Sequence, residues 1–217
     1  DKITLESYDN SVAPVVAAIT AEQSDNPQQA AGTREPGQVI IKAKSLIVGG
    51  GSSHNFDRWF NKEDCATLAK AFVDVQYTDQ PNFLDESIEK LEVLYLSNNQ
   101  PIKNKDVRAS IMNRAKNGKG LLLVHPALWY NWPDWPEYNK QLVGGGARSH
   151  DQFGEFEVTV IDPKHPIMKG LPETFKITDE LYHFQKDTSG PPIEVLDRMS
   201  TRLNSSHVSE SRMPSSA

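Results

Sequence analysis

The clearest pattern in the chain is a series of short, mostly apolar runs at residues 45–48, 73–77, 93–96 and 121–124. The last run is aliphatic throughout, whereas a half-exposed strand would alternate apolar and polar positions, so it predicts a strand buried on both faces. Helical patterns separate the runs at residues 61–72, 82–90 and 106–116. Strands that alternate with helices predict an α/β fold, with a parallel sheet, right-handed crossovers and helices on both faces.

The pattern changes after Tyr130. An aromatic, proline-rich loop is followed by weaker periodic segments, which predict one short helix and further short strands. We expect these strands to extend the parallel sheet or to form an antiparallel edge. The loop covers residues 131–136, the helix 137–142, and the strands 156–161, 181–184 and 193–196.

Both ends of the chain differ in composition from its middle. Residues 20–38 are rich in Gln, Ala, Pro, Gly and charge without a period, which is typical of segments that bury little apolar surface. We interpret residues 1–38 as an N-terminal extension or linker and residues 39–200 as one domain.

The final residues have a different origin in our interpretation. Residues 201–207 and 211–217 correspond, codon by codon, to the two arms of a common sequencing adapter, with an index between them. The sequence therefore predicts an adapter-derived tail over residues 201–217, which takes no part in the fold. It also predicts that the domain is truncated at its C-terminus and lacks its last strand and helix.

Composition excludes several classes of partner. A net charge of −6 without a Lys/Arg cluster argues against a nucleic-acid partner. No apolar run approaches the roughly 18–20 residues of a membrane span, so no membrane segment is predicted. The single cysteine, Cys65, cannot form an internal disulfide and leaves the compartment open. No cofactor is indicated.

The predicted strand ends carry polar residues, and in an open α/β sheet ligands bind at the carboxyl ends of the strands. Imidazoles near a carboxylate form an acid/base set that works near neutral pH, and tryptophans offer flat faces that stack on sugar rings. The candidate catalytic residues are His125, His150, His54 and Glu180. The candidate substrate-binding residues are Asn98, Asn99, Trp129, Trp132, Arg148 and Tyr182.

His125 holds the most informative of these positions. It follows the buried strand directly, and Pro126 disfavours a helical backbone at the residue before it. A sharp turn at this point is how a nucleophile elbow is built. Here the elbow carries an imidazole in place of a serine or cysteine.

Each candidate could also have a purely structural role. The histidines could be hydrogen-bonded structural residues, and the tryptophans could pack a lid. Gly49, Gly50 and Gly51 could cradle an anion, although a tight turn is the simpler reading of a run that matches no nucleotide fingerprint. Three histidines and a carboxylate would suit zinc, but no short ligand spacing occurs, and we predict no metal site.

Several motifs together resemble the ThuA-like (trehalose utilisation) family, a branch of the class I glutamine amidotransferase-like superfamily with a flavodoxin-like sheet. They occur in order within about residues 45–196 and are specific as a set. The motifs are residues 50–60, 96–101, 120–132, 142–150, 156–166, 169–172 and 179–182.

The resemblance implies a flavodoxin-like fold, a role in carbohydrate metabolism and a small-molecule carbohydrate substrate. It suggests a hydrolase or lyase that acts on a disaccharide such as trehalose or on its 3-keto derivative. A glutaminase of the superfamily needs a cysteine at the elbow, whereas this chain has His125 there and Cys65 in a helical segment. Two alternatives remain open: a non-catalytic carbohydrate-binding or accessory domain, and a metal-dependent sugar enzyme.

Overall fold

A computed structural model describes residues 16–20, 43–71 and 73–200. These residues divide into two compact units. The large unit takes in the described residues up to Arg148 together with residues 184–192, and the small unit takes in residues 149–183 and 193–200. The predicted adapter-derived tail and most of the predicted N-terminal extension lie outside the described residues.

The large unit is built on a five-stranded sheet with the order β1-β5-β4-β2-β3. The strands are β1 (Val16–Thr20), β2 (Ala43–Val48), β3 (Val73–Thr78), β4 (Val93–Leu96) and β5 (Gly120–Val124). β2 to β5 pair in parallel, and β1 pairs with β5 in the antiparallel direction. The predicted parallel sheet is therefore confirmed. β1 comes from the segment interpreted as an extension, where the sequence predicts no strand.

The order of the parallel strands identifies the topology. Counted along the chain, the four parallel strands lie in the order second, first, third, fourth, which is the flavodoxin-like arrangement. The chain leaves β2 towards one edge to form β3 and then returns to the other side of β2 to form β4. The carboxyl ends of β2 and β4 therefore flank the switch point, where such folds bind ligands.

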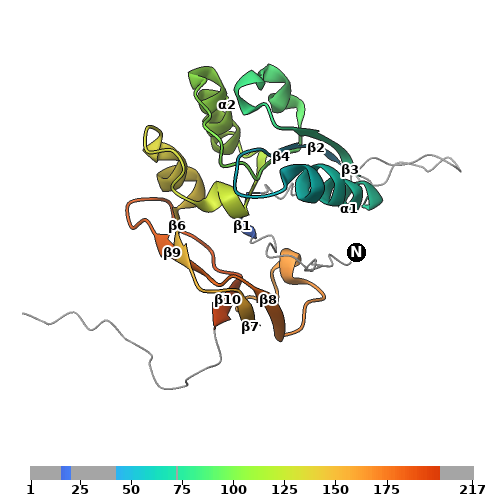
Figure 1. Ribbon diagram of the computed structural model, residues 1–217, viewed down its shortest axis with the longest axis vertical. Coiled ribbons are helices and arrows are strands. Elements are labelled where there is room, and N and C mark those ends of the chain that lie inside the picture. Colours follow the sequence, from blue (N-terminus) through green and yellow to red (C-terminus); the bar gives the residue numbers. More distant parts are fainter. Residues whose placement is uncertain (1–15, 21–42, 72, 201–217) are drawn as a thin grey trace, which may run out of the picture. The chain divides into compact units, whose positions relative to one another are not determined.

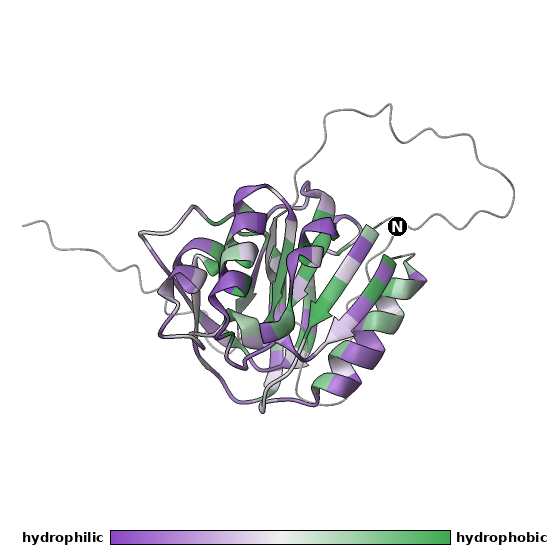
Figure 2. Cartoon of the chain, turned by 90° about the horizontal axis from the view of Figure 1, so that it is seen from above, coloured by the Kyte–Doolittle hydropathy of each residue, from purple (hydrophilic) through white to green (hydrophobic). Residues whose placement is uncertain are grey.

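Helical segments cover both faces of this sheet (Figure 1). On one face, sheet residues such as Leu94, Leu96 and Leu123 pack in a cluster with Val107 and Ile111 of α2 (Lys105–Lys116). On the other face, a second cluster joins the sheet to the helical segment before β3. Figure 2 shows the hydrophobic stretches of the central strands between these layers. The prediction of helices on both faces is confirmed.

The helix before β3 begins earlier than predicted. It starts as η2 (Asp57–Asp64), wound as a π-helix, and continues as α1 (Cys65–Lys70). Asn61, the first residue of the predicted helical pattern, lies inside η2, where its side-chain amide donates to Asp57 at 2.8 Å. The hydroxyl of Tyr95 on β4 donates to Asp64 at 2.7 Å and so ties this helix to the sheet.

The connections on the α2 side differ in how well the sequence predicts them. Residues 82–90 form two short 3₁₀ turns, η3 (Pro81–Phe83) and η4 (Glu86–Lys90), because Asp85 accepts from the Ser87 N–H and starts a new turn. α2 agrees with its prediction to within one residue. It is capped by Asn104 and ends before Gly118, whose φ is 68°.

The chain after β5 contains short helices and two antiparallel sheets. In the large unit, η5 (His125–Leu128) and η6 (Tyr138–Val143) follow β5. β6 (Gly145–His150) pairs with β9 (Tyr182–Lys186), and the division between the units falls inside both strands.

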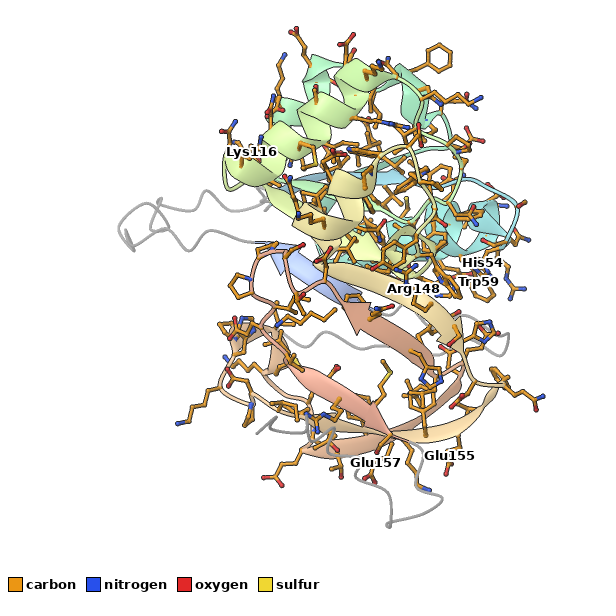
Figure 3. All side chains as sticks on the ribbon, turned by 90° about the vertical axis from the view of Figure 1, so that its left-hand side faces the viewer. His54, Trp59, Lys116, Arg148, Glu155 and Glu157 are labelled. Atoms are coloured by element: carbon orange, nitrogen blue, oxygen red, sulfur yellow. The ribbon has the colours of Figure 1, made fainter. Side chains whose placement is uncertain are left out.

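The small unit contains a three-stranded antiparallel sheet. Its elements are β7 (Gly154–Val160), η7 (Pro166–Met168), β8 (Thr174–Asp179) and β10 (Asp197–Ser200), with the strand order β10-β7-β8. Glu155 on β7 pairs with Lys176 on β8 at 2.6 Å (Figure 3). The expectation that the later strands join the parallel sheet is wrong, since they pair with one another. Residues 193–196 are not a strand, and β10 begins at Asp197.

Among the described residues, no helix has both the length and the apolar character that a membrane crossing requires.

Candidate functional site

The turn at the end of β5 has the sharp geometry that the sequence predicts. His125 has a φ of 44°, and it is the only described non-glycine residue with a positive φ. Its side chain is buried, with 3% exposed. A non-glycine residue in this region is strained by about 1–2 kcal/mol, and such strain is concentrated at functional sites. The elbow therefore holds an imidazole at the carboxyl end of a central strand.

The strain at His125 can be measured apart from its imidazole. We expect His125→Gly to be more stable than His125→Ala by about 1 kcal/mol, because both lack the ring and only glycine adopts this φ without cost. Urea denaturation of the two variants gives the difference.

The matched control is Ala109→Gly, on the exposed surface of α2. There glycine should cost about 1 kcal/mol, since a helix interior disfavours it. If His125→Gly is no more stable than His125→Ala, the backbone at the elbow is not strained.

The structure brings His54 and His125 together. His54 lies in the loop after β2 (Figure 3), and its Nε2 is 2.8 Å from the Nε2 of His125. At this distance one nitrogen carries the hydrogen and the other accepts it, because two N–H groups would repel each other. The ring centroids are 4.5 Å apart. The two Nε2 atoms are thus engaged with each other and can exchange donor and acceptor roles, and each ring has its Nδ1 as second nitrogen.

Glycines allow the loop that carries His54 to pack closely on the loop after β4. Gly50 and Gly51 have φ values of 101° and 134°. A Cβ on Gly51 would lie 1.7 Å from the side-chain oxygen of Asn99, and one on Gly50 would lie 2.2 Å from the side-chain nitrogen of Gln100. Only glycine therefore fits at either position. This geometry is that of a tight turn, the simpler of the two readings of the glycine run.

The predicted binding residues Asn98 and Asn99 take different places in the loop after β4. Asn99 braces the histidine loop, because its side-chain amide donates to the Ser53 hydroxyl at 2.8 Å. Asn98 is fully buried, and its Oδ1 has no hydrogen-bond partner among the described residues. A buried acceptor of this kind calls for a donor that the described residues do not supply. Asn98 therefore keeps its place as a candidate ligand contact.

The tryptophans divide between core and surface. Trp132 is buried in the cluster with Trp135 and Tyr138, and its indole N–H donates to the Gln100 carbonyl at 3.0 Å. This burial agrees with the alternative reading of Trp132 as a packing residue, and its contact with a sugar ring stays a prediction. Trp129 is half-buried and forms an isolated backbone bridge with Ala147.

On β6, Arg148 directly follows Ala147, the residue that forms the bridge with Trp129. Its guanidinium is 3.4 Å from the ring centroid of Tyr130, and its Nε donates to Gln185 at 3.1 Å. The side chain is exposed on β6. A cation stacked on an aromatic ring is held in one orientation, so Arg148 presents its remaining N–H groups in a fixed position.

A second set of predicted residues comes together in the small unit. Nδ1 of His150 lies 3.7 Å from Oε1 of Glu180, and the Tyr182 hydroxyl donates to Oε2 of Glu180 at 2.6 Å. Burial first, and then the hydrogen bond to Glu180, raise the pKa of Tyr182, which therefore stays a neutral donor. Glu180 is thus fixed by the phenol, whereas Nδ1 of His150 donates to the Asp151 carbonyl at 2.8 Å.

The same unit contains a histidine–carboxylate contact that the sequence does not single out. Nε2 of His183 lies 2.8 Å from Oδ1 of Asp151, on an exposed part of the surface. The sequence signal for this contact was that Asp151 directly follows the candidate residue His150.

The candidate acid/base residues are divided between the units. His54 and His125 belong to the large unit, and His150 and Glu180 belong to the small one. Their joint action stays a prediction. In the described ranges, no three His, Cys, Asp or Glu side chains form a group that could hold a metal ion.

Cys65 lies in α1, on a different element from the elbow, and packs partly buried against the second core cluster. Burial raises the pKa of its thiol, and the charge of Asp64 acts in the same direction. A thiol of this kind is a poor nucleophile at neutral pH.

Comparison with known proteins identifies one family. The family model ThuA, described as "Trehalose utilisation", matches residues 46–216, which is more than half of the chain. This range includes most of the segment interpreted as an adapter-derived tail. No curated protein matches the sequence.

Two solved structures have the same fold. The crystal structure of a ThuA-like protein from Parabacteroides merdae has a TM-score of 0.63 and 19% identity, and the alignment covers 72% of this chain and 68% of that chain. A ThuA-like protein from Bacteroides uniformis has a TM-score of 0.61 and 23% identity, with 77% and 72% covered.

Proposed function

Because the chain belongs to the ThuA family, we propose that it processes a disaccharide such as trehalose, or its 3-keto derivative, by acid/base chemistry of its histidines. The family places the protein in carbohydrate utilisation. The contact that carries the proposal is the 2.8 Å approach of His54 to His125 at the strand end. A hydrogen bond between two imidazoles lets a proton taken up by one ring be shared with the other, so the pair can accept a proton from one substrate atom and return one to another.

The 3-keto sugar suits this pair particularly well. Its carbonyl acidifies the neighbouring C2–H, and the glycosidic oxygen leaves from C1, one bond further on. The accepting imidazole takes the C2 proton, the C1–O bond breaks, and the departing oxygen takes a proton from a donor. Charge and protons then balance without a further reactant.

The other predicted residues support this chemistry in distinct roles. His125 is fixed by the elbow and acts as the central acid/base residue, with His54 as its partner. Asn98 and Arg148 contact substrate hydroxyls, and His150 and Glu180 of the small unit stay predicted catalytic residues. No thiol step is involved, since the residue at the elbow is a histidine.

A matched substrate panel tests the proposal. The purified chain is incubated with trehalose, 3-keto-trehalose and the corresponding pair of methyl glucosides, and products are followed by NMR and mass spectrometry. We expect the keto member of each pair to react faster than its parent, because only the keto sugar has an acidic C2–H. Saturable binding without any product would contradict an enzyme and support an accessory carbohydrate-binding domain.

A further inference from the structure

The large unit contains a cleft that neither His54 nor His125 lines. Its volume is about 600 Å³, within the range of roughly 300–1,000 Å³ that is typical of small-molecule sites. It lies beyond the carboxyl ends of β2, β3 and β4, the edge where this fold binds ligands. The residues that matter for its chemistry are Gly50, Phe56, Asp57, Tyr77, Asp79 and Gln100.

The charges around the cleft argue against an anionic ligand. Asp57 and Asp79 both line it, and a phosphate or carboxylate would be repelled by them. The Asp57 carboxylate already has partners, because Lys62 pairs with it at 2.7 Å and the Asn61 amide donates to it at 2.8 Å. The cleft also offers the Asp79 carboxylate, whose Oδ1 accepts from the Gln80 side-chain amide at 2.9 Å.

The remaining groups are hydrogen-bonding and aromatic. Burial, and then the charge of Asp79, raise the pKa of Tyr77 to about 12, so its hydroxyl keeps its hydrogen at neutral pH. The ring of Tyr77 packs directly on Gly49, where an added Cβ would lie 2.5 Å from the phenol oxygen. The side-chain amide of Gln100 donates to the backbone carbonyls of Gly49 and Asp79, at 2.9 and 2.7 Å, and these bonds fix it at the cleft.

We infer that this cleft binds a neutral, hydroxyl-rich ring. Sugar hydroxyls donate to the Asp79 carboxylate and accept from the Tyr77 hydroxyl, and the aromatic residues supply the apolar surface that a ring face needs. Phe56 lines the cleft, and its ring centroid lies 5.8 Å from that of His54. If the proposed function holds, the cleft takes the part of the sugar substrate that extends beyond His54.

Binding is measured by calorimetry with the 217-residue chain and trehalose as the probe. Tyr77→Phe should weaken binding by about three- to tenfold, because it removes one neutral hydrogen bond and keeps the ring on Gly49. Asp79→Asn should weaken it by about tenfold, because it replaces a charged acceptor with a neutral one. Asp74→Asn, the same change at the exposed amino end of β3, should leave the affinity unchanged.

Three results would overturn the inference. The first is a lack of trehalose binding by the folded wild-type chain, and the second is unchanged affinity in both cleft variants. The third is preferential binding of putrescine with a steep loss of affinity in salt, which would identify a cation site. The His125→Ala variant separates this inference from the proposed function, since it should still bind trehalose in a manner that depends on Tyr77. If turnover fails while this binding persists, only the proposed reaction is rejected.

Discussion

Replacing His125 by alanine should lower the turnover of the best substrate in the panel by about 10²–10⁴-fold, which is the typical contribution of a positioned acid/base residue. The imidazole is buried at a strained elbow and contacts the Nε2 of His54 at 2.8 Å. Its loss removes the imidazole held at the strand end and leaves His54 without the ring with which it shares a hydrogen. Initial rates measured with saturating substrate report the effect on the chemical step.

His165→Ala is the matched control for this experiment. His165 caps η7 in the small unit, where its Nδ1 accepts from the Ile167 N–H at 3.3 Å. Its turnover should stay within about twofold of the wild-type value, as expected for a residue with a local structural role. Full activity of a correctly folded His125→Ala chain would reject the elbow histidine as the acid/base residue.

The central sheet could be predicted from the sequence because its strands are buried on both faces. β4 agrees with its predicted residues, and β5 agrees to within one residue, because a short aliphatic run between turn residues is typical of a buried strand. The antiparallel strands were harder to predict from the sequence. β10 has the sequence Asp-Arg-Met-Ser, whose position is set by pairing with β7 and not by its own pattern. Along β8, exposed residues alternate with more buried ones, and this two-residue period was the signal that the sequence analysis missed.

The site could be predicted in position but not in its contacts. The rule that ligands bind at the carboxyl ends of parallel strands places His54 and His125 at one edge. Their direct contact depends on the path of the glycine loop, which is set by packing against Asn99 and Gln100. The same rule, applied to the end of β3, would have found Asp79. The burial of Trp132 depends on long-range packing with Tyr138 and therefore had no local signal.

At the amino ends of the same strands, one buried arginine holds several loops together. Arg114 on α2 is fully buried, and its guanidinium donates to the backbone carbonyls of Ile88, Leu91, Glu92 and Gly120. These carbonyls belong to η4, to the turn before β4 and to the start of β5. Burial lowers the pKa of Arg114, and the nearby charges of Glu89 and Glu92 oppose this effect. The arginine is thus a structural clamp.

We expect Arg114→Ala to lower the free energy of unfolding by about 3–5 kcal/mol, because it leaves several carbonyls unpaired and opens a cavity. In a chain of this size the change corresponds to a melting temperature about 10 °C lower. Arg114→Lys should recover only part of the loss, since an ammonium cannot reach carbonyls spread around a planar fork. Denaturation in urea, followed by circular dichroism, measures both variants.

The control for the clamp is Lys116→Ala, an exposed position on the same helix (Figure 3). Its effect should stay within about 0.5 kcal/mol, as is usual for surface substitutions. An equal loss in Lys116→Ala and Arg114→Ala would mean that the carbonyl contacts contribute little, since alanine itself favours a helix at both positions. A large loss of stability in Arg114→Ala alone would show that the Arg114 side chain on α2 stabilises the amino ends of β4 and β5. The clamp then fixes β4 and β5 at one end, so that their other ends can place Asn98 and His125.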